Sequence, residues 1–383
     1  MALDQETFLQ MKDVVSRFVK ERLIPAEDSV EQTNEVPENI VQDMRDMGLF
    51  GLSIPEEYGG LGLSMTQECD IIFELCQASL SFRSVIGTTV GIGSQGLVMT
   101  GTEEQKQHYL PRLASGEISS SFCLTEPEAG SDAASLRMTA IKDGDYYVLN
   151  GTKRYITNAL RAGLLTVMAR TDRTIKGAGG ISAFLVDPSI AGIHIAKADD
   201  KMGQRGTKTS DVIFEDARVP AAALLGGVEG QGFYTAMRVL DRGRLHLSSV
   251  ATGISQRILQ EALAYAAERK QFGRAIGEFQ LVQAMLADSQ ADLYAGMAMT
   301  KDAAKKYDEG DDISMLAACC KMFTTEAAGR IADKAVQIHG GAGYMSEYKV
   351  ERFYRDVRLL RLYEGTTQIQ QLVIGRSLLK SVD

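Results

Sequence analysis

One glutamate of the sequence, Glu364, stands between an apolar segment and a glycine, where a carboxyl group can lose contact with water. Leu359 and Leu362 are among the apolar residues before it, and Gly365 follows it directly. Loss of water disfavours the charged form of a carboxyl group and raises its pKa toward the range of a general base. The residues alone leave a second interpretation open, in which Glu364 only neutralises the dipole of a helix expected over 367–381.

Residues 122–132 combine hydroxyl groups, a proline and a glycine at a point where an expected strand opens into a loop. Such a loop can present backbone N–H groups to a polar ring or a phosphate, although an ordinary polar turn has a similar composition. Tyr155 and Thr157 lie at the end of another expected strand. Taken together, the two segments favour a wall for a flat cofactor.

A dinucleotide-binding pattern also occurs, because residues 91–96 read Gly-x-Gly-x-x-Gly and Glu117 follows about 20 residues later. The surrounding segments have helical periodicity, however, and no alternation of strands and helices follows the pattern. We therefore expect these glycines to allow close packing of helices rather than to bind a nucleotide.

Composition limits the classes of partner and the compartment. The net charge of −9 and the pI near 5.2 argue against nucleic acid. No apolar run reaches the roughly 18 residues that span a membrane. The five cysteines lack metal-ligand spacing and the four histidines are scattered, so we expect reduced thiols and no metal site. Acidic residues occur early in residues 1–6, which predicts neither a signal nor a transit peptide and places the protein in the cytoplasm.

The elements that must position these residues follow from hydrophobic periodicity, which divides the chain into helical, β-rich and helical parts. We predict an α+β, mainly α protein with a helical domain over 1–118, a β-barrel or sandwich over 119–228 and a helical bundle over 229–383. A helix over 103–110 is expected to end near Pro111. The expected strands include 146–149, 164–169, 181–186 and 212–214. The expected helices of the last part cover 233–269, 278–308, 312–338, 346–358 and 367–381.

Several short motifs occur together and in one order, and with them the chain resembles the acyl-CoA dehydrogenases, a family of flavoenzymes, over nearly its whole length. The resemblance implies an N-terminal helical domain, a middle β-domain and a C-terminal four-helix bundle, in agreement with the periodicity. It also implies FAD as the cofactor. The motifs are 55–62 (PEEYGGLG), 124–132 (LTEPEAGSD), 155–158 (YITN), 269–273 (RKQFG), 337–344 (QIHGGAGY) and 363–366 (YEGT).

The resemblance also implies a homotetramer, in which the contacts to each FAD come from two subunits. Residues of one subunit would line the isoalloxazine, and residues of a neighbouring subunit would reach the adenine and pyrophosphate half. Tyr155 stands where tryptophan is common, which keeps an aromatic ring but weakens the expected stacking. The first set is Phe122, Leu124, Thr125, Gly130, Ser131, Tyr155 and Thr157. The second set is Arg269, Gln271, Phe272, Gln280, Gln337 and Gly341, with Thr366 and Gln368 closing the same FAD.

The activity that the resemblance implies is α,β-dehydrogenation of an acyl-CoA thioester. Glu364 would take the α-proton while the β-hydrogen leaves as hydride to the flavin, and the backbone N–H of Glu364 would help to polarise the thioester carbonyl. Some relatives carry the base on the helix that here includes Gly243, which has no side chain to serve as a base. Electrons would pass to an electron-transfer flavoprotein. The residues expected to border the substrate are Ser131, Asp241, Arg244, Tyr363 and Gly365.

The sequence leaves the identity of the acyl group of the substrate undecided. Arg83 lies in a stretch that resembles the place where glutaryl-CoA dehydrogenases use an arginine for the distal carboxylate, and Gly87 stands at the position of their accompanying serine. An inward-facing Arg83 would favour a dicarboxylyl-CoA, because a buried arginine needs an anion, whereas an outward-facing one would have no role in specificity. The functions of an acyl-CoA oxidase and of a non-catalytic relative that binds acyl-CoA also stay open. A nitroalkane oxidase would be expected to carry aspartate in place of Glu364.

Overall fold

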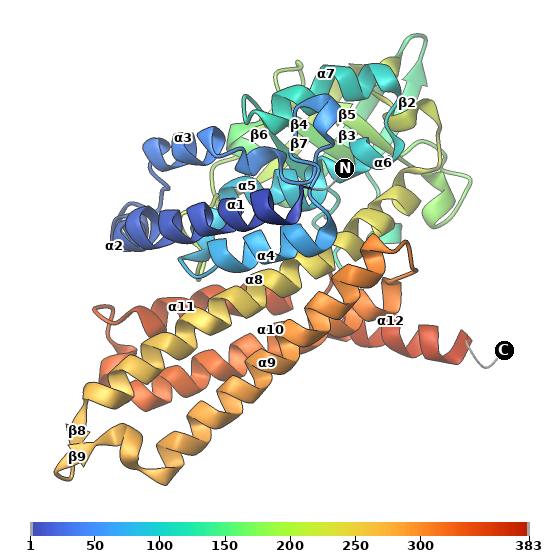
Figure 1. The fold of residues 1–383 in the computed structure, drawn as a ribbon. Helices are drawn as coiled ribbons and strands as arrows, with labels where there is room; N and C mark the ends of the chain where they lie inside the picture. Colours follow the sequence, from blue (N-terminus) through green and yellow to red (C-terminus); the bar gives the residue numbers. More distant parts are fainter. Residues whose placement is uncertain (1–2, 381–383) are drawn as a thin grey trace.

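The computed structural model describes residues 3–380, which form three parts in chain order (Figure 1). Helices make up the first part, and polar side chains cap several of them. The Ser64 hydroxyl, for example, accepts a hydrogen bond from the N–H of Gln67 in a capping box. The helices of this part are α1 (Gln5–Phe18), α2 (Ile24–Thr33), α3 (Glu38–Asp46), α4 (Met65–Leu75), α5 (Leu80–Gly87), α6 (Gln95–Thr100) and α7 (Glu103–Ala114).

The prediction that a helix ends near Pro111 is wrong, since α7 continues from there to Ala114. Proline lacks the N–H that would bond to the carbonyl one turn earlier in the helix. That carbonyl belongs to Gln107, and both residues are exposed, so water can satisfy it without breaking the helix.

The pattern Gly-x-Gly-x-x-Gly lies in helical segments, the π-helix Thr88–Gly93 and α6, as predicted. A Cβ atom on Gly93 would lie 2.0 Å from Ser120 Oγ, and a Cβ atom on Gly96 would lie 3.5 Å from Leu225 Cδ2. Close packing therefore explains Gly93, whereas the contact at Gly96 would be an ordinary van der Waals contact that a side chain could make.

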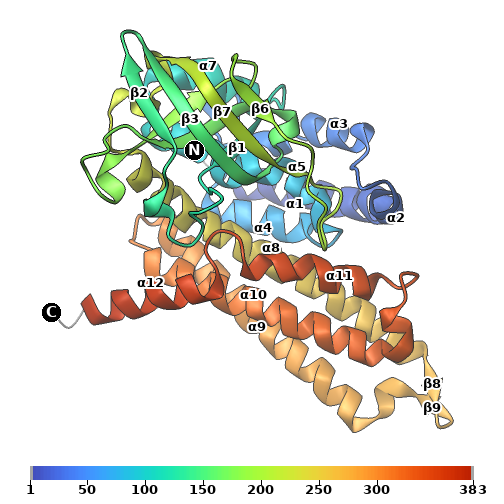
Figure 2. The same ribbon diagram turned by 180° about the vertical axis from the view of Figure 1, so that it is seen from behind.

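One curled sheet of seven strands forms the second part, with the order β1-β4-β2-β3-β7-β6 and with β5 paired to β4. Strands β2, β3, β7 and β6 lie side by side in Figure 2. All six residues of β5 are buried, whereas burial alternates along much of β7, as expected for a strand with one face on a core. The strands are β1 (Ser119–Cys123), β2 (Thr139–Asp143), β3 (Tyr146–Thr157), β4 (Ala162–Arg170), β5 (Ile181–Val186), β6 (Ile193–Ile195) and β7 (Thr209–Pro220).

Long helices form the third part. Helices α8 to α11 make up the predicted bundle, α12 extends from one end of it, and the short hairpin β8–β9 lies at the other end (Figures 1 and 2). The elements are α8 (Gly232–Glu268), β8 (Lys270–Gln271), β9 (Arg274–Ala275), α9 (Gln280–Asp308), α10 (Ser314–His339), α11 (Lys349–Val357) and α12 (Thr367–Lys380). The end of the predicted last helix, residue 381, lies outside the described residues.

Apolar packing joins the first and third parts into one core, to which Val15 of α1, Leu247 of α8 and Phe353 of α11 all belong. The sheet has a separate core that includes Val167 of β4 and Phe184 of β5. The predicted architecture of helices, β-domain and helices is confirmed. Strand β1 contacts the π-helix Thr88–Gly93, and strand β5 contacts α8, so the sheet and the helices meet along these strands.

The five cysteines are free thiols, and four of them are buried. Among residues 3–380, no helix combines the length and the apolar character that crossing a bilayer requires. Within the same residues, no group of histidine, cysteine and carboxylate side chains is arranged to hold a metal ion.

Candidate active site

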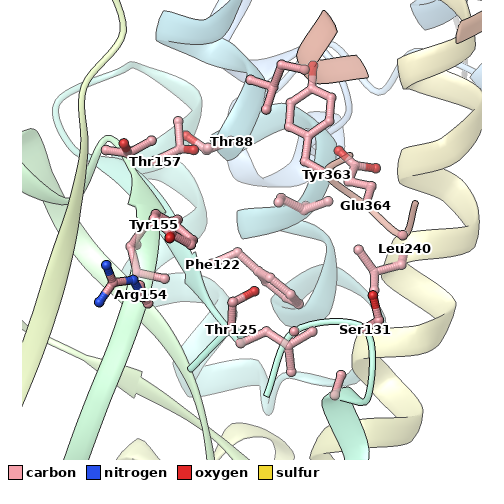
Figure 3. Close-up of a pocket in the computed structure, with 18 of the residues that line it drawn as sticks. Thr88, Phe122, Thr125, Ser131, Arg154, Tyr155, Thr157, Leu240, Tyr363 and Glu364 are labelled. Carbon is pink, nitrogen blue, oxygen red and sulfur yellow. The ribbon is translucent and has the colours of Figure 1, made fainter. Parts of the chain in front are cut away.

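A pocket of about 520 Å³ opens between the sheet, α5, α8 and the turn before α12. Figure 3 shows Glu364 and Leu240 on one side of it and Tyr155 and Thr157 on the other. Most of the residues predicted for a flavin and a thioester come together here, although they lie far apart in the sequence. They are Arg83, Phe122, Leu124, Thr125, Gly130, Ser131, Tyr155, Thr157, Arg244, Tyr363, Glu364 and Gly365.

Three predicted site residues near the pocket do not line it. Asp241 forms an ion pair with Arg244 along α8, and because the arginine is buried this is not an ordinary surface pair. The Thr366 hydroxyl accepts a hydrogen bond from the N–H of Ile369 and so caps α12. Gln368 is exposed. In this structure, Asp241 therefore holds the Arg244 guanidinium, and Thr366 caps the first turn of α12.

The six residues predicted for the adenine half of FAD do not line the pocket, and they lie in or next to the hairpin β8–β9, at the first residue of α9 and at the end of α10. All six are exposed, and Phe272 leaves 93% of its surface accessible. They are Arg269, Gln271, Phe272, Gln280, Gln337 and Gly341. Their contact with the FAD of a neighbouring subunit stays a prediction.

The turn that carries Glu364 is held from two sides. The φ angles of 54° at Glu364 and 86° at Gly365 lie in the left-handed region, which costs free energy at a residue with a Cβ atom. Lys321 Nζ donates a hydrogen bond to the carbonyl of Gly365 at 2.6 Å. Gln370 Nε2 donates to the carbonyls of both turn residues, at 3.1 and 2.9 Å. These bonds offset the cost and fix the direction in which the glutamate side chain leaves the turn.

The Glu364 carboxyl group has lost contact with water without gaining hydrogen bonds to both of its oxygens. Its Oε2 atom is buried and has no hydrogen-bond partner in the described chain. A Cβ atom on Gly243 would lie 2.6 Å from that oxygen, so glycine at this position makes room for the carboxyl group. Burial raises the pKa of Glu364, and the positive charges of Arg83, Lys321 and Arg244 oppose the rise. This environment favours a general base over a residue that only neutralises a helix dipole.

Another wall of the pocket offers the groups that a flavin needs. Phe122 supplies apolar surface, and the hydroxyl groups of Thr125, Ser131 and Thr157 make no hydrogen bond within residues 3–380. A Cβ atom on Gly130 would meet nothing within 4 Å, so the loop leaves space beside them. A flat ring with an apolar face and polar edges fits these residues.

The ring of Tyr155 is also available to a planar ligand. Its backbone has a φ angle of 58°, and the residue is 60% exposed although it lines the pocket. The Arg154 guanidinium lies 4.9 Å from the ring centroid, which restrains the ring by a cation–π interaction. An aromatic face is therefore kept where tryptophan is common in the family.

Sequence reasoning missed several residues of the site. Thr88, Lys201 and Gln204 line the pocket, and Lys321 and Gln370 hold the turn. One feature of the sequence could have indicated Lys321, because it is the lone cation within residues 317–328, a helical segment made mostly of small and apolar residues. A lysine that is fully buried in such a segment has to be paired, and burial, opposed by the charge of the Glu364 carboxyl group, lowers the pKa of Lys321 to about 8.

Comparison with known proteins agrees with this geometry. The family models for the N-terminal, middle and C-terminal domains of acyl-CoA dehydrogenases match residues 5–117, 121–217 and 230–379. A probable acyl-CoA dehydrogenase of Bacillus subtilis is 43% identical over 370 residues, which cover 97% of both chains. The CarC subunit of the caffeyl-CoA reductase-Etf complex of Acetobacterium woodii is 42% identical over 353 residues, 92% of this chain and 93% of that one. The structure of butyryl-CoA dehydrogenase from Megasphaera elsdenii is similar with a TM-score of 0.94 at 33% identity, over 99% of both chains.

Matches that extend over all three parts, together with a pocket that fits a flavin, establish the family. Members of this family are flavoproteins that carry FAD. The chain therefore belongs to the acyl-CoA dehydrogenase family and is an FAD-dependent oxidoreductase.

Proposed function

We propose that this protein oxidises an acyl-CoA thioester between its α and β carbons to the trans-2-enoyl-CoA, with Glu364 as the base. The observation that carries the proposal is the Oε2 atom of Glu364, a buried carboxylate oxygen without a hydrogen-bond partner in the described chain. A buried polar atom without a partner costs free energy, so its presence in a pocket points to a ligand. The α-hydrogen of a bound thioester is the proton that this oxygen would take.

Removal of an α-proton also needs polarisation of the thioester carbonyl. The backbone N–H of Glu364 makes no hydrogen bond within the described residues and can donate one to the thioester oxygen. Because Lys321 and Gln370 hold the turn, this N–H and the carboxyl group keep a fixed relation. FAD, when bound, supplies the acceptor for the β-hydride.

The remaining predicted contacts are part of the same proposal. Ser131, Tyr363 and Arg244 would border the thioester, with Asp241 holding the guanidinium. The exposed residues near β8–β9 would reach the FAD of a neighbouring subunit in a homotetramer. The exposure of Phe272 supports such an interface, since a neighbouring subunit that covered the ring would remove its apolar surface from water.

The proposed electron acceptor is an electron-transfer flavoprotein. The relative from Acetobacterium woodii supports it, because that protein is named as a subunit of a reductase-Etf complex. The same name supports a second candidate activity, the reduction of a 2-enoyl-CoA in the reverse direction. A carboxyl group with a raised pKa suits both directions, since its protonated form can deliver the α-proton.

Turnover of the purified protein with electron-transfer flavoprotein and a panel of acyl-CoA thioesters tests the proposal. We expect a product two hydrogen atoms lighter than the thioester, formed with reduction of the flavoprotein partner. Supply of the 2-enoyl-CoA and a reduced partner tests the reverse direction. Hydrogen peroxide without reduction of the partner would indicate an oxidase, and the absence of product in both directions would contradict the proposal.

A dicarboxylyl-CoA is the second candidate substrate, because Arg83 faces the inside of the protein. Arg83 lines the pocket and is only 5% exposed. Its charge reaches the site, since it acts against the burial that raises the pKa values of Tyr363 and Glu364. Within residues 3–380, Arg83 forms no ion pair with a carboxylate. A carboxylate at the far end of an acyl chain would supply the missing anion.

Arg83→Ala is expected to lower the ratio of kcat/KM for glutaryl-CoA over pentanoyl-CoA by about 10- to 100-fold, because only glutaryl-CoA carries a terminal carboxylate. Stopped-flow measurement of flavin reduction gives both values. Arg376→Ala is the matched control, because it removes an exposed cation of the same pocket and should leave the ratio unchanged. Equal losses for the two thioesters in Arg83→Ala would remove Arg83 from the specificity of the enzyme.

A further inference from the structure

Arg83 begins a chain of four buried polar side chains that runs from the pocket into the helical core. Arg83 Nε donates a hydrogen bond to His246 Nε2 at 2.9 Å. His246 Nδ1 lies 2.6 Å from Glu68 Oε1, and Glu68 also accepts hydrogen bonds from Arg242. None of the four side chains belongs to a residue more than 5% exposed. These four side chains therefore form a buried hydrogen-bonded network and not a pattern of surface charges.

These bonds determine the protonation of His246. An arginine can only donate, so the Nε2 atom that faces Arg83 is the acceptor, and Nδ1 carries the proton that Glu68 accepts. Burial and the charge of Arg83 lower the pKa of His246 to about 4, although Glu68 opposes the change, so the imidazole is neutral. Two arginines at +1 each and one carboxylate at −1 leave the group with a net charge of +1.

Glycine on α5 leaves space for the Arg83 guanidinium. A Cβ atom on Gly87 would lie 2.8 Å from Cζ and 2.9 Å from Nη1 of Arg83, so a larger residue would displace the group. The Nε atom is engaged by His246, whereas Nη1 and Nη2 make no hydrogen bond within the described residues. The two Nη groups are thus left as free donors of a residue that lines the pocket.

We propose that His246, anchored by Glu68 and Arg242, is a positioning residue that turns the Nη groups of Arg83 toward the pocket and so selects acyl-CoA thioesters with a terminal carboxylate. This inference rests on the acyl-CoA activity proposed above. A carboxylate accepts two parallel hydrogen bonds from a guanidinium, and the net positive charge of the buried group provides the attraction. If these four side chains served only to stabilise the fold, breaking the bond between His246 and Arg83 would not change the preference of the enzyme for one thioester over the other.

Glutamine and asparagine at position 246 allow the two hydrogen bonds of the imidazole, one with Arg83 and one with Glu68, to be tested one at a time. The amide of glutamine reaches the place of Nε2 and can accept from Arg83, whereas the amide of asparagine reaches only the place of Nδ1 beside Glu68. In His246→Gln we expect the ratio of kcat/KM for glutaryl-CoA over pentanoyl-CoA to stay within about threefold of the wild-type ratio. In His246→Asn we expect it to fall about 10- to 100-fold. FAD content and thermal unfolding of both variants separate this effect from misfolding.

A double-mutant cycle completes the test. Once Arg83→Ala has removed the guanidinium, His246→Asn should no longer change the ratio. Equal ratios in the two His246 variants, an effect that persists without Arg83, or a wild-type ratio near one would overturn the inference. A ratio of Kd values, measured by calorimetry on the FAD-loaded Glu364→Gln protein with and without the change at His246, reports the same selectivity with little flavin reduction. Failure of the proposed function is distinct, because then neither thioester would reduce the wild-type flavin.

Discussion

Glu364→Gln is expected to retain FAD and to bind acyl-CoA, yet to reduce the flavin about 10²- to 10⁴-fold more slowly than the wild type. Glutamine keeps the size of the side chain, for which Gly243 leaves room, and removes the group that takes the proton. Because burial raises the pKa of Glu364 above its ordinary value of 4.5, the wild-type rate should rise with pH through that pKa. This rise should be absent from the variant. Anaerobic stopped-flow absorbance measures both properties.

Glu364→Asp provides the comparison, since it keeps a carboxylate but withdraws it by one methylene group. Its rate should fall between those of the wild type and Glu364→Gln, because proton transfer depends on distance. If Glu364→Gln reduced the flavin at the wild-type rate and with the same dependence on pH, Glu364 would not be the base.

Lys321→Met should slow flavin reduction about 10- to 100-fold, although Lys321 does not line the pocket. The variant loses the 2.6 Å bond from a buried ammonium group to the carbonyl of Gly365, worth about 1.5–3 kcal/mol. It also removes one of the three charges, with those of Arg83 and Arg244, that oppose the rise of the Glu364 pKa. The increase of rate with pH should therefore move to higher pH than in the wild type. Rate profiles against pH and thermal unfolding measure the two effects.

Lys334→Met is the matched control for this prediction. Lys334 lies on the same helix, α10, and forms a partly exposed ion pair with Asp288, which contributes at most about 1 kcal/mol. We expect this control to leave the pH profile unchanged. A Lys321→Met enzyme that lost thermal stability but kept the wild-type pH profile would show that Lys321 supports the fold and has no influence on the base.

Periodicity predicted those elements whose burial follows a simple pattern. The helix expected over 233–269 is α8, Gly232–Glu268, and the strand expected over 181–186 is β5 with the same bounds. Prediction from periodicity failed where an element is too short to show a hydrophobic pattern, or where a proline falsely indicated the end of a helix. The three residues of β6 are too few to show alternation, and Pro111 continues a helix because its unpaired carbonyl partner faces water.

The site was predicted to the extent that its residues belong to contiguous motifs. Glu364 and the segment 122–132 could be recognised in the sequence, and the structure places residues of both in one pocket. The residues that hold them could not, because Lys321 is 44 positions from Gly365 and Glu68 is 178 positions from His246. A single sequence shows that a charge lies on an apolar helix face, but the partner that makes this burial tolerable depends on which helices pack together.

An anaerobic visible spectrum of the purified protein, recorded before and after addition of butyryl-, isobutyryl-, octanoyl- and glutaryl-CoA, tests the assignment of an acyl-CoA dehydrogenation to this pocket most directly. We predict a flavin band that at least one of these thioesters bleaches in the wild type, and that the same thioester bleaches about 10²- to 10⁴-fold more slowly in Glu364→Gln. A wild-type flavin band that no thioester bleaches, or a protein without a flavin band after reconstitution with FAD, would contradict the assignment.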